Sequence, residues 1–546
     1  MDVRLDGEAV MRDGTVLRAD IHRPPTGSGP WPVLLARGPY GKQDPGILAR
    51  LAPSAAARRG YLVVIQDTRG RFASDGDWEP LVNEYDDGYD TVRWAAALPG
   101  ADGRVAMYGP SYLGHAQWAA AAARPPELVA LMPEFTWSEP EDGLLARGGV
   151  PERGLLAQWT LGLGYEVLRR RHAAAPRERR RALGEWADAV AALHAVQAPL
   201  AAWDPPMLRE LPLPGRSGGP AVRPAFDGSR QPGLPTFTVA GWYDAFLQGS
   251  LDQHIRARAS GHPAALVVGP WSHEEQTARV GARDFGPGAG QAAIDGGRSL
   301  LDLRLDWLDA VLGSGPAAEA VAGSSALVFV TGANTWRRLD SWPPEAVPTP
   351  WFLRRDGALS LWPPEADEAP DAFRHDPADP APVRGGALLL TAAYPAGPFD
   401  QRAVEARPDV LVWTGPPLAE PLEVVGRVRV ALVAAASAGP ADWVARLCDV
   451  APDGTSVNLT DGIVRTAGPG PAEMVIDLWS TAHVFGPGHR LRLQVAAAGH
   501  PRWENASPRA VRTVFHDPDR PSRIVLPVVG GAGPAAAPGE VTPPRT

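Results

Sequence analysis

The chain has 546 residues, of which 45% are hydrophobic and 21% are charged, and its formal net charge is −9. This length exceeds what one hydrophobic core usually serves, so we expect two or three domains. The balance of apolar and charged residues excludes a disordered chain. The acidic charge, with one arginine run interleaved with glutamates, argues against nucleic-acid binding.

Cys448 is the only cysteine, which excludes an intrachain disulfide and a cysteine-rich zinc site. No apolar run approaches the ~20 residues that a membrane-spanning helix needs, and the N-terminal segment lacks the apolar core of a secretion signal. We therefore expect a cytoplasmic protein that binds neither membrane nor nucleic acid. A homo-oligomer is possible.

Strand-like and helix-like stretches alternate in the first part of the chain. Strands are predicted at 31–38, 61–67 and 104–109, and helices near 47–59 and 85–97. Strands separated by helices predict a parallel, doubly wound sheet.

The alternation stops at about residue 141, where a helix-rich and arginine-rich stretch begins and continues to about residue 233. Strand signals then return at 236–246 and 265–274, followed by a helix near 300–312. We interpret the helical stretch as an insertion into the first domain.

The sequence pattern changes again after Trp351, where short runs of alternating apolar and polar residues are divided by Pro/Gly turns. Two such runs, 426–433 and 489–496, are typical of an antiparallel sandwich or jelly roll. The end of the chain is rich in Gly, Pro and Ala, which predicts disorder. The expected divisions are an α/β domain at 1–140 and 234–345, a helical insertion at 141–233, a β domain at 346–529 and a disordered tail at 530–546.

Three polar residues each follow an apolar, strand-like run of the α/β domain: Ser111 follows RVAMYG, Asp244 follows TFTVAGWY and His273 follows ALVVGPWS. Catalytic groups of open α/β sheets lie at the carboxyl ends of strands, so we expect these side chains to meet. Their order along the chain is that of the α/β-hydrolase triad. Each residue has a structural alternative, namely a helix cap for Ser111, a turn for Asp244 and a polar loop for His273. All three structural alternatives would have to hold at once, at three strand ends and in the order of a triad. A catalytic triad explains the three positions with one cause.

Two details qualify this triad. The serine lies in Gly109-Pro-Ser-Tyr-Leu-Gly114, so the second glycine comes one position later than in the usual G-x-S-x-G elbow, with Leu113 in its place. His254 and His262 compete with His273, but His254 lies in a predicted helix and His262 precedes a strand.

The chain resembles the family of cocaine esterases and X-Pro dipeptidyl-peptidases, serine acyl hydrolases that include α-amino acid ester hydrolases. The family uses G-x-S-Y-x-G, which accounts for the displaced glycine. The resemblance spans nearly the whole chain. The matching stretches are ARGPYGK (36–42), VIQDTRGRFASDG (64–76), GPSYLG (109–114), GWYDAF (241–246), GPWSH (269–273), GPFDQRAVEARPDVLVWT (397–414) and LCDVAPDG (447–454).

The resemblance implies an α/β-hydrolase domain with an inserted helical cap and a C-terminal β jelly-roll domain. It implies that Ser111 is the nucleophile, that His273 is the general base and acid, and that Asp244 orients the imidazole. The hydroxyl of Tyr40 and the backbone N–H of Tyr112 would form the oxyanion hole, although Tyr40 could instead simply line the pocket. Neither a metal nor an organic cofactor is implied.

The residues that line the substrate pocket are harder to identify from the sequence than the catalytic residues. Trp242, Phe246 and Trp271 lie beside the motifs and are candidates for substrate binding, and Trp137 or Trp159 could join them. We expect the cap to bound the pocket without supplying chemistry, because the triad lies outside it.

Acidic residues near the start of the cap could hold a substrate ammonium group, although solvation of the surface explains them equally well. They are Glu134, Glu139, Glu141 and Asp142. Charged residues of the DTRGRF loop, namely Asp67, Arg69 and Arg71, are expected to organise the loop and not to act on substrate.

The sequence thus predicts a serine hydrolase that cleaves carboxylic esters, with activated amides as a second substrate class, through an acyl-enzyme. Its partner would be a small-molecule ester or amide. The alternatives are an X-Pro dipeptidyl-peptidase or an acyltransferase on the same triad, and a jelly-roll binding protein with a vestigial hydrolase domain.

Overall fold

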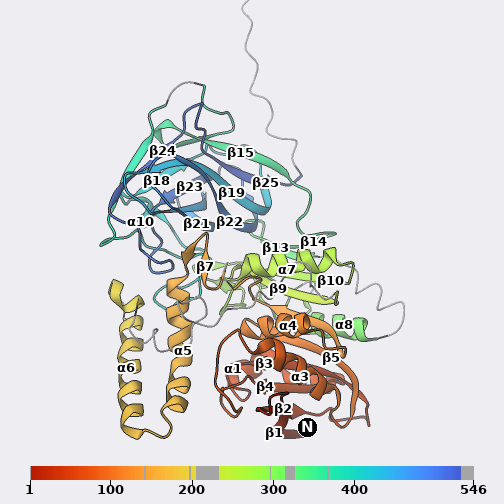
Figure 1. Cartoon of the computed structure of the whole chain (residues 1–546). Coiled ribbons are helices and arrows are strands. Elements are labelled where there is room, and N and C mark those ends of the chain that lie inside the picture. Colours follow the sequence, from red (N-terminus) through yellow and green to blue (C-terminus); the bar gives the residue numbers. More distant parts are fainter. Residues whose placement is uncertain are drawn as a thin grey trace, which may run out of the picture.

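The computed structural model describes residues 2–140, 143–195, 198–204, 233–294, 297–313, 326–365 and 368–530. The molecule has two main parts, an α/β part that contains the N-terminus and a β part at the opposite end (Figure 1). A pair of long helices lies beside the α/β part and reaches the β part at one end (Figure 1). The predicted tail at 530–546 lies, except for Gly530, outside the described residues.

The α/β part is built around a mixed sheet of ten strands. Its strands are β1 (Val3–Val10), β2 (Val16–His22), β3 (Trp31–Gly38), β4 (Leu62–Asp67), β5 (Ala101–Pro110), β6 (Leu128–Glu134), β9 (Thr236–Tyr243), β10 (Ala264–Ser272), β13 (Ala326–Val330) and β14 (Thr335–Leu339). The spatial order is β1-β2-β4-β3-β5-β6-β9-β10-β13-β14. Pairs from β4 to β13 are parallel, and the outer pairs are antiparallel.

Helices cover both faces of this sheet. Helices α1 (Pro45–Leu51), α2 (Pro53–Arg59) and α8 (Leu300–Leu312) share a core with one face, which includes Ala36, Ile65 and Val239. Helices α3 (Glu84–Ala96), α4 (Tyr112–Ala123) and α7 (Leu247–Ala259) pack against the other face. The strands between β4 and β10 are buried on both sides, which explains their near-continuous apolar sequences.

One predicted helix is divided in two. The stretch 47–59 was expected to form a single helix, but α1 and α2 are separated at Ala52, whose backbone has a positive φ of 47°. Pro53 follows Ala52. Proline lacks an amide proton and restricts the preceding residue, so the helix ends there and restarts with Pro53 at its first position.

The insertion follows β6 and precedes β9. It contains the short strands β7 (Ala146–Arg147) and β8 (Val150–Pro151), the helices α5 (Arg153–Arg171) and α6 (Pro176–His194), and a 3₁₀ turn, η1 (Leu200–Trp203). Helices α5 and α6 pack on each other as a hairpin beside the α/β part (Figure 1).

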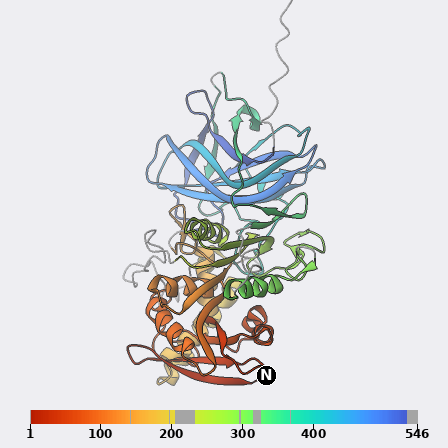
Figure 2. The same cartoon turned by 90° about the vertical axis from the view of Figure 1, so that its right-hand side faces the viewer.

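The C-terminal part is a largely antiparallel β domain whose strands enclose one apolar core (Figure 2). Its strands are β15 (Val347–Arg354), β16 (Ala358–Ser360), β17 (Asp371–His375), β18 (Val410–Thr414), β19 (Leu422–Ala436), β20 (Ala441–Val450), β21 (Ser456–Thr466), β22 (Ala472–Phe485), β23 (Arg490–Ala496), β24 (Ala510–Phe515) and β25 (Arg523–Val528). The predicted fold class is therefore confirmed: an α/β-hydrolase sheet with a helical insert and a C-terminal β domain.

Buried charged residues join the insertion to the β domain. Arg147 lies 3.7 Å above the ring of Trp479 and pairs with Asp461 at 3.6 Å. Asp461 also pairs with Arg502 at 2.9 Å and Arg446 at 3.5 Å. Burial opposes ionisation of the Asp461 carboxyl, but the surrounding guanidinium groups lower its pKa. The insertion is thus fixed to the β domain at its first turns.

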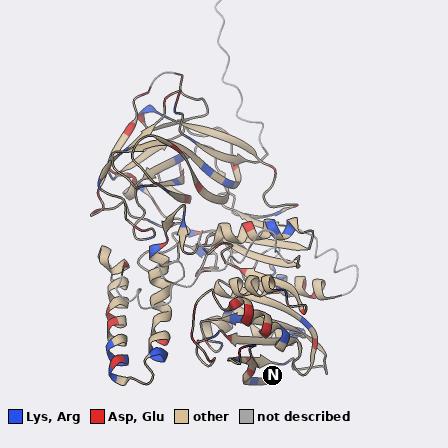
Figure 3. Cartoon of the chain, viewed as in Figure 1, with Lys and Arg blue, Asp and Glu red and all other residues tan. Residues whose placement is uncertain are grey.

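Charge is mixed along the chain, and acidic and basic residues are interspersed in both parts (Figure 3). The arginine run noted in the sequence lies at the end of α5 and the start of α6, where Arg181 pairs with Glu185 at 3.2 Å. Among the described helices, none is long and apolar enough to span a membrane.

Burial of His254 on α7 has a consequence for stability. Burial lowers the pKa of His254 to about 4, whereas an unfolded histidine titrates near ~6.5. Between these pH values His254 is protonated in the unfolded chain but not in the folded chain, so the free energy of unfolding falls as pH falls. At about pH 5 the loss from this residue is about 2 kcal/mol.

We therefore expect His254→Met to reduce, by about 2 kcal/mol, the loss of unfolding free energy between about pH 7 and about pH 5. Urea denaturation of both proteins at both pH values measures this difference. An equal loss in the variant and the parent protein would show that His254 is not the titrating group.

Candidate active site

Ser111 occupies a sharp turn between strand β5 and helix α4. Its φ is 59° and its ψ is −124°, a conformation that residues with a side chain rarely adopt. Its N–H donates to the carbonyl of Glu134 at 2.8 Å, and its carbonyl accepts from the Thr136 hydroxyl at 2.8 Å. Both partners belong to β6 and the residues that follow it, so the neighbouring strand holds the turn in place.

Both glycines of the motif are required by close packing around this turn. Gly109 has a φ of +126°, and a Cβ there would lie 2.8 Å from the side chain of Leu113. A Cβ at Gly114 would lie 2.7 Å from Thr136. The second glycine is therefore needed at position 114, where the helix passes Thr136, and not at position 113.

His273 and Asp244 form a buried pair at the ends of β10 and β9. The Nδ1 atom of His273 lies 2.6 Å from Oδ2 of Asp244, and neither side chain is more than 5% exposed. The other oxygen of Asp244 accepts from the N–H of Phe246 at 2.7 Å. The His273 carbonyl accepts from Arg50 at 2.9 Å and Gln276 at 2.7 Å, which fixes the backbone of the loop.

Ser111 and His273 both line one cavity of about 680 Å³ between the α/β part, the insertion and the β domain. Its lining combines aromatic and apolar side chains with six charged ones, namely Asp44, Arg50, Arg71, Glu166, Arg169 and Glu274. Residues from all three regions contribute, among them Tyr40, Phe72, Trp159, Leu163, Tyr165 and Leu389.

Tyr40 and Tyr112 lie on two sides of Ser111. The Tyr40 hydroxyl interacts with the Ser111 side chain and accepts a hydrogen bond from the indole N–H of Trp159 at 3.2 Å. Burial raises the pKa of Tyr40, so the hydroxyl keeps its proton. Tyr112 is the first residue of α4, and an N–H in the first turn of a helix has no partner within the helix. Two donors are thus available beside Ser111.

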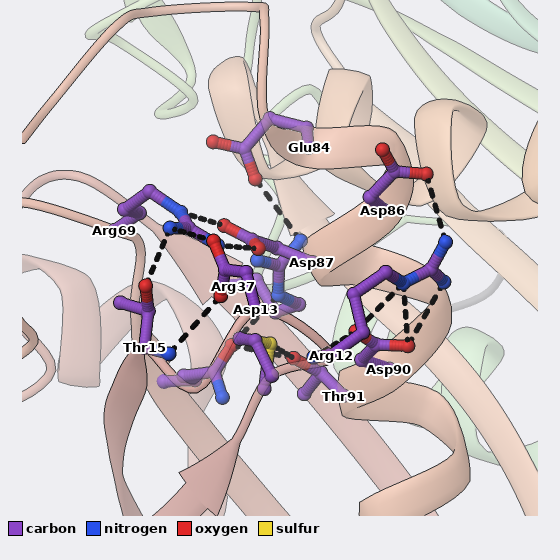
Figure 4. Close-up of polar contacts among 12 residues, drawn as sticks. Arg12, Asp13, Thr15, Arg37, Arg69, Glu84, Asp86, Asp87, Asp90 and Thr91 are labelled. Carbon is purple, nitrogen blue, oxygen red and sulfur yellow. Dashed lines mark hydrogen bonds and ion pairs between the residues drawn. The ribbon is translucent and has the colours of Figure 1, made fainter. Parts of the chain in front are cut away.

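The side chain of Tyr112 points away from the cavity into a buried polar network. Its hydroxyl donates to Glu84 at 2.9 Å and accepts from the N–H of Leu81 at 2.9 Å. Glu84 in turn pairs with Arg37 at 3.0 Å, a contact drawn in Figure 4. Burial raises the pKa of Glu84, although Arg37 opposes this. The network anchors the first turn of α4.

The charged residues of the DTRGRF loop contact the protein itself. Figure 4 shows Arg69 between Asp87 and Asp13, at 2.6 and 2.7 Å. Asp67 accepts from the N–H of Lys42 at 2.7 Å, and burial raises its pKa to about 6. Arg71 differs from these residues, because it also lines the cavity; its partners are described below.

The three aromatic residues that the sequence suggested for substrate binding lie in the core and not in the lining of the cavity. Trp242 packs on Trp342, and Trp271 donates its indole N–H to the Ala289 carbonyl at 2.8 Å. Phe246 packs edge-on against His273, with ring centroids 5.3 Å apart. Adjacency to a motif in the sequence did not mean exposure in the cavity, because strand ends are packed on both faces.

The cavity takes its aromatic side chains instead from α5, from the loop after β4 and, for Tyr40, from the segment after β3. Trp159, Leu163 and Glu166 are spaced by four and three residues, so they share one face of α5. That spacing was readable in the sequence. Leu389 was not, because it comes from an irregular segment of the β domain.

Two of the acidic residues near the start of the cap have cationic partners. Glu134 pairs with Arg304, and Glu139 pairs with Arg256 at 3.2 Å. Neither lines the cavity. Glu141 and Asp142 lie outside the described residues.

The competing histidines lie away from the Asp244 carboxyl. His254 is fully buried on α7, and His262 lies in an exposed turn before β10. His115, in the first turns of α4, is stacked on Trp137, and burial lowers its pKa to about 3. Within the described residues, no group of three or more His, Cys, Asp or Glu side chains could hold a metal ion.

Comparison with known proteins agrees with this architecture. The family model described as X-Pro dipeptidyl-peptidase (S15 family) matches residues 13–275. The model described as X-Pro dipeptidyl-peptidase C-terminal non-catalytic domain matches residues 323–525. The cocaine esterase of Rhodococcus sp. is 34% identical to the chain over 586 aligned positions, which cover 95% of this chain and 97% of that relative.

Two solved structures share the fold over nearly the whole length. An aminopeptidase from the marine sediment archaeon Thaumarchaeota archaeon aligns with a TM-score of 0.74 at 24% identity, covering 97% of each chain. An α-amino acid ester hydrolase aligns with a TM-score of 0.71 at 24% identity, covering 96% of each chain. The elbow serine, the arrangement of domains and the full-length match to a curated esterase lead to one conclusion: the chain belongs to the cocaine esterase and X-Pro dipeptidyl-peptidase family of serine hydrolases.

Proposed function

We propose that the chain hydrolyses carboxylic esters through an acyl-enzyme formed on Ser111. The observation that carries the proposal is the buried Asp244–His273 pair at 2.6 Å, which shares a cavity with a serine held in a strained turn. Such strain at a functional group persists only where the surrounding structure imposes it.

In this proposal each group of the site has one step. Because Nδ1 of His273 faces Asp244, its Nε2 is left to accept the proton of Ser111 as the serine oxygen attacks the ester carbonyl. His273 then returns this proton to the leaving alcohol. Water attacks the acyl-enzyme in the same way and releases the acid. Asp244 stabilises the imidazolium that forms in each step.

Tyr40 and Tyr112 would stabilise the negative charge that develops on the carbonyl oxygen. Preorganised donors contribute most when they point at charge that appears only in the transition state. The Tyr40 hydroxyl already contacts Ser111, and the backbone N–H of Tyr112 belongs to the residue next to the serine.

The aromatic and apolar lining favours an ester with a compact apolar or aromatic group. A dipeptidyl-peptidase must also hold the free amino terminus of its substrate, which calls for an available carboxylate. Glu166 in the cavity is engaged by Arg71 at 3.1 Å and Arg169 at 3.5 Å. Asp44 accepts from the N–H of Ile47, whereas Glu274 also lines the cavity and has no ion pair within the described residues. The preference for esters over X-Pro peptides therefore rests on the full-length match to a curated esterase and not on the lining.

We expect a fluorophosphonate probe to label the protein at Ser111, because only a serine with a positioned base reacts at neutral pH. Ser111→Ala should abolish both labelling and turnover, with an unchanged circular dichroism spectrum. Ser360→Ala, in the β domain, is the matched control and should be labelled normally. Persistent labelling of Ser111→Ala would place the nucleophile elsewhere.

Aryl esters of small acids should be turned over with a kcat/KM at least about a hundredfold above that of Xaa-Pro anilides, a difference of about 2.7 kcal/mol. A chromogenic assay of both substrate sets on the same preparation gives the ratio. If the anilides were the better substrates, the chain would be a peptidase on the same triad.

Tyr40→Phe should lower kcat by about 10²–10³, the usual cost of removing one oxyanion donor, while KM changes much less. Tyr61→Phe is the control, because it removes a partly buried hydroxyl that donates to Asp309, outside the cavity. A Tyr40→Phe variant with a kcat near that of the parent would leave Tyr40 only as a wall of the pocket.

A further inference from the structure

Trp159, on helix α5 of the insertion, contacts both residues of the oxyanion hole. Its indole N–H lies 3.2 Å from the Tyr40 hydroxyl oxygen. Its ring is stacked on that of Tyr112, with centroids 6.2 Å apart and an interplanar angle of 22°. No other aromatic residue is recorded against both tyrosines within the described part of the chain.

The direction of the hydrogen bond follows from the chemistry of its partners. An indole N–H can only donate, so the Tyr40 oxygen must be the acceptor. The single proton of the Tyr40 hydroxyl is therefore turned away from Trp159 and can be donated to an oxyanion that forms at Ser111. Accepting one hydrogen bond also polarises the hydroxyl and strengthens the hydrogen bond that it donates.

We propose that Trp159 is a positioning residue of the oxyanion hole, which orients and polarises the Tyr40 hydroxyl for the transition state. The inference rests on the oxyanion role proposed above for Tyr40. It revises the expectation that the cap only bounds the pocket, because one side chain of the cap then acts on the chemical step through Tyr40.

The buried side chain of Arg71 links helix α5 to the backbone beside Tyr40. Arg71 donates through Nε to the carbonyl of Pro39 at 2.8 Å, and Pro39 immediately precedes Tyr40. The same guanidinium pairs with Glu166 of α5 at 3.1 Å. One buried side chain thus holds the backbone beside Tyr40 and the helix that carries Trp159.

The β domain fixes the other end of α5. Glu152, which precedes the helix, accepts from the indole N–H of Trp503 at 2.9 Å and lies 3.3 Å from Nε of Arg502. The N–H of Gly154 donates to the Arg502 carbonyl at 2.9 Å. A Cβ at Gly154 would lie 2.5 Å from Leu390, so the helix approaches the β domain as closely as glycine allows. The position of Trp159 therefore depends on all three regions.

Trp159 also lines the cavity, so a loss of activity on its replacement could come from altered substrate packing. A double-mutant cycle separates these roles. We would measure kcat and KM with p-nitrophenyl acetate, whose small acyl group limits packing effects, for the parent protein, Trp159→Phe, Tyr40→Phe and the double variant.

Trp159→Phe keeps an aromatic ring against Tyr112 but removes the N–H donor together with part of the indole, and the Tyr40→Phe background controls for the lost volume. We expect it to lower kcat about threefold to tenfold in the parent background, the range for loss of one hydrogen bond, and to change KM by less than about twofold. In the Tyr40→Phe background the same substitution should change kcat by less than about twofold, because no hydroxyl remains to be oriented.

Trp186→Phe is the matched control. Its indole N–H donates at 2.8 Å to the Leu161 carbonyl, so the variant loses an indole hydrogen bond within the same helix pair but outside the cavity. Its kcat should match that of the parent. Trp159→His, whose ring keeps an N–H donor, should recover part of the lost kcat. If Trp159→Phe fails to fold, Trp159→Leu, which also lacks the donor, replaces it in the cycle.

Two outcomes would overturn the inference in distinguishable ways. If Trp159→Phe lowered kcat equally in both backgrounds, Trp159 would be a wall of the pocket while the oxyanion role of Tyr40 stood. If Tyr40→Phe itself left kcat unchanged, the oxyanion proposal would fail first, and the positioning role would fail with it.

Discussion

The site depends on the positive φ of Ser111. A residue with a side chain does not hold this conformation unless its surroundings impose it, and here they do so from two directions. Glu134 and Thr136, on the neighbouring strand and just after it, hydrogen-bond the serine backbone, while Gly109 and Gly114 let the chain approach Leu113 and Thr136. The turn lifts the hydroxyl into the cavity that His273 also lines.

The parallel sheet supplies the rest of the constellation. Strands β5, β9 and β10 end at the same edge, which is why residues far apart in the chain can meet. The insertion and the β domain then close the space above this edge and give the cavity its walls. The sheet thus determines the position of the proposed catalytic residues, and the insertion and the β domain determine the shape of the cavity that a substrate would enter.

The added regions are also coupled to the sheet by buried charge. Arg71 links the loop before Tyr40 to α5, and Glu152 and Arg147 link the start of the insertion to the β domain. Removing one partner of a buried ion pair leaves an uncompensated buried charge, so we expect substitutions at these contacts to be strongly destabilising. The stacked rings of Trp159 and Tyr112 join helix α5 of the insertion to helix α4 of the α/β part.

Local patterns in the sequence determined much of this protein: the helix Leu300–Leu312 and the strand Trp31–Gly38 have the predicted bounds, and the residues proposed as a triad lie at strand ends. Ala52 was not foreseen as a break, because Pro53 can also start a helix. Only the tertiary structure decided which aromatic side chains face the cavity. Trp242 and Trp271 adjoin motifs yet are buried, whereas Trp159 reaches Tyr40 through contacts 119 positions apart. The spacing of apolar residues predicts which segments form helices and strands. It does not predict contacts between domains, because these depend on how whole elements pack.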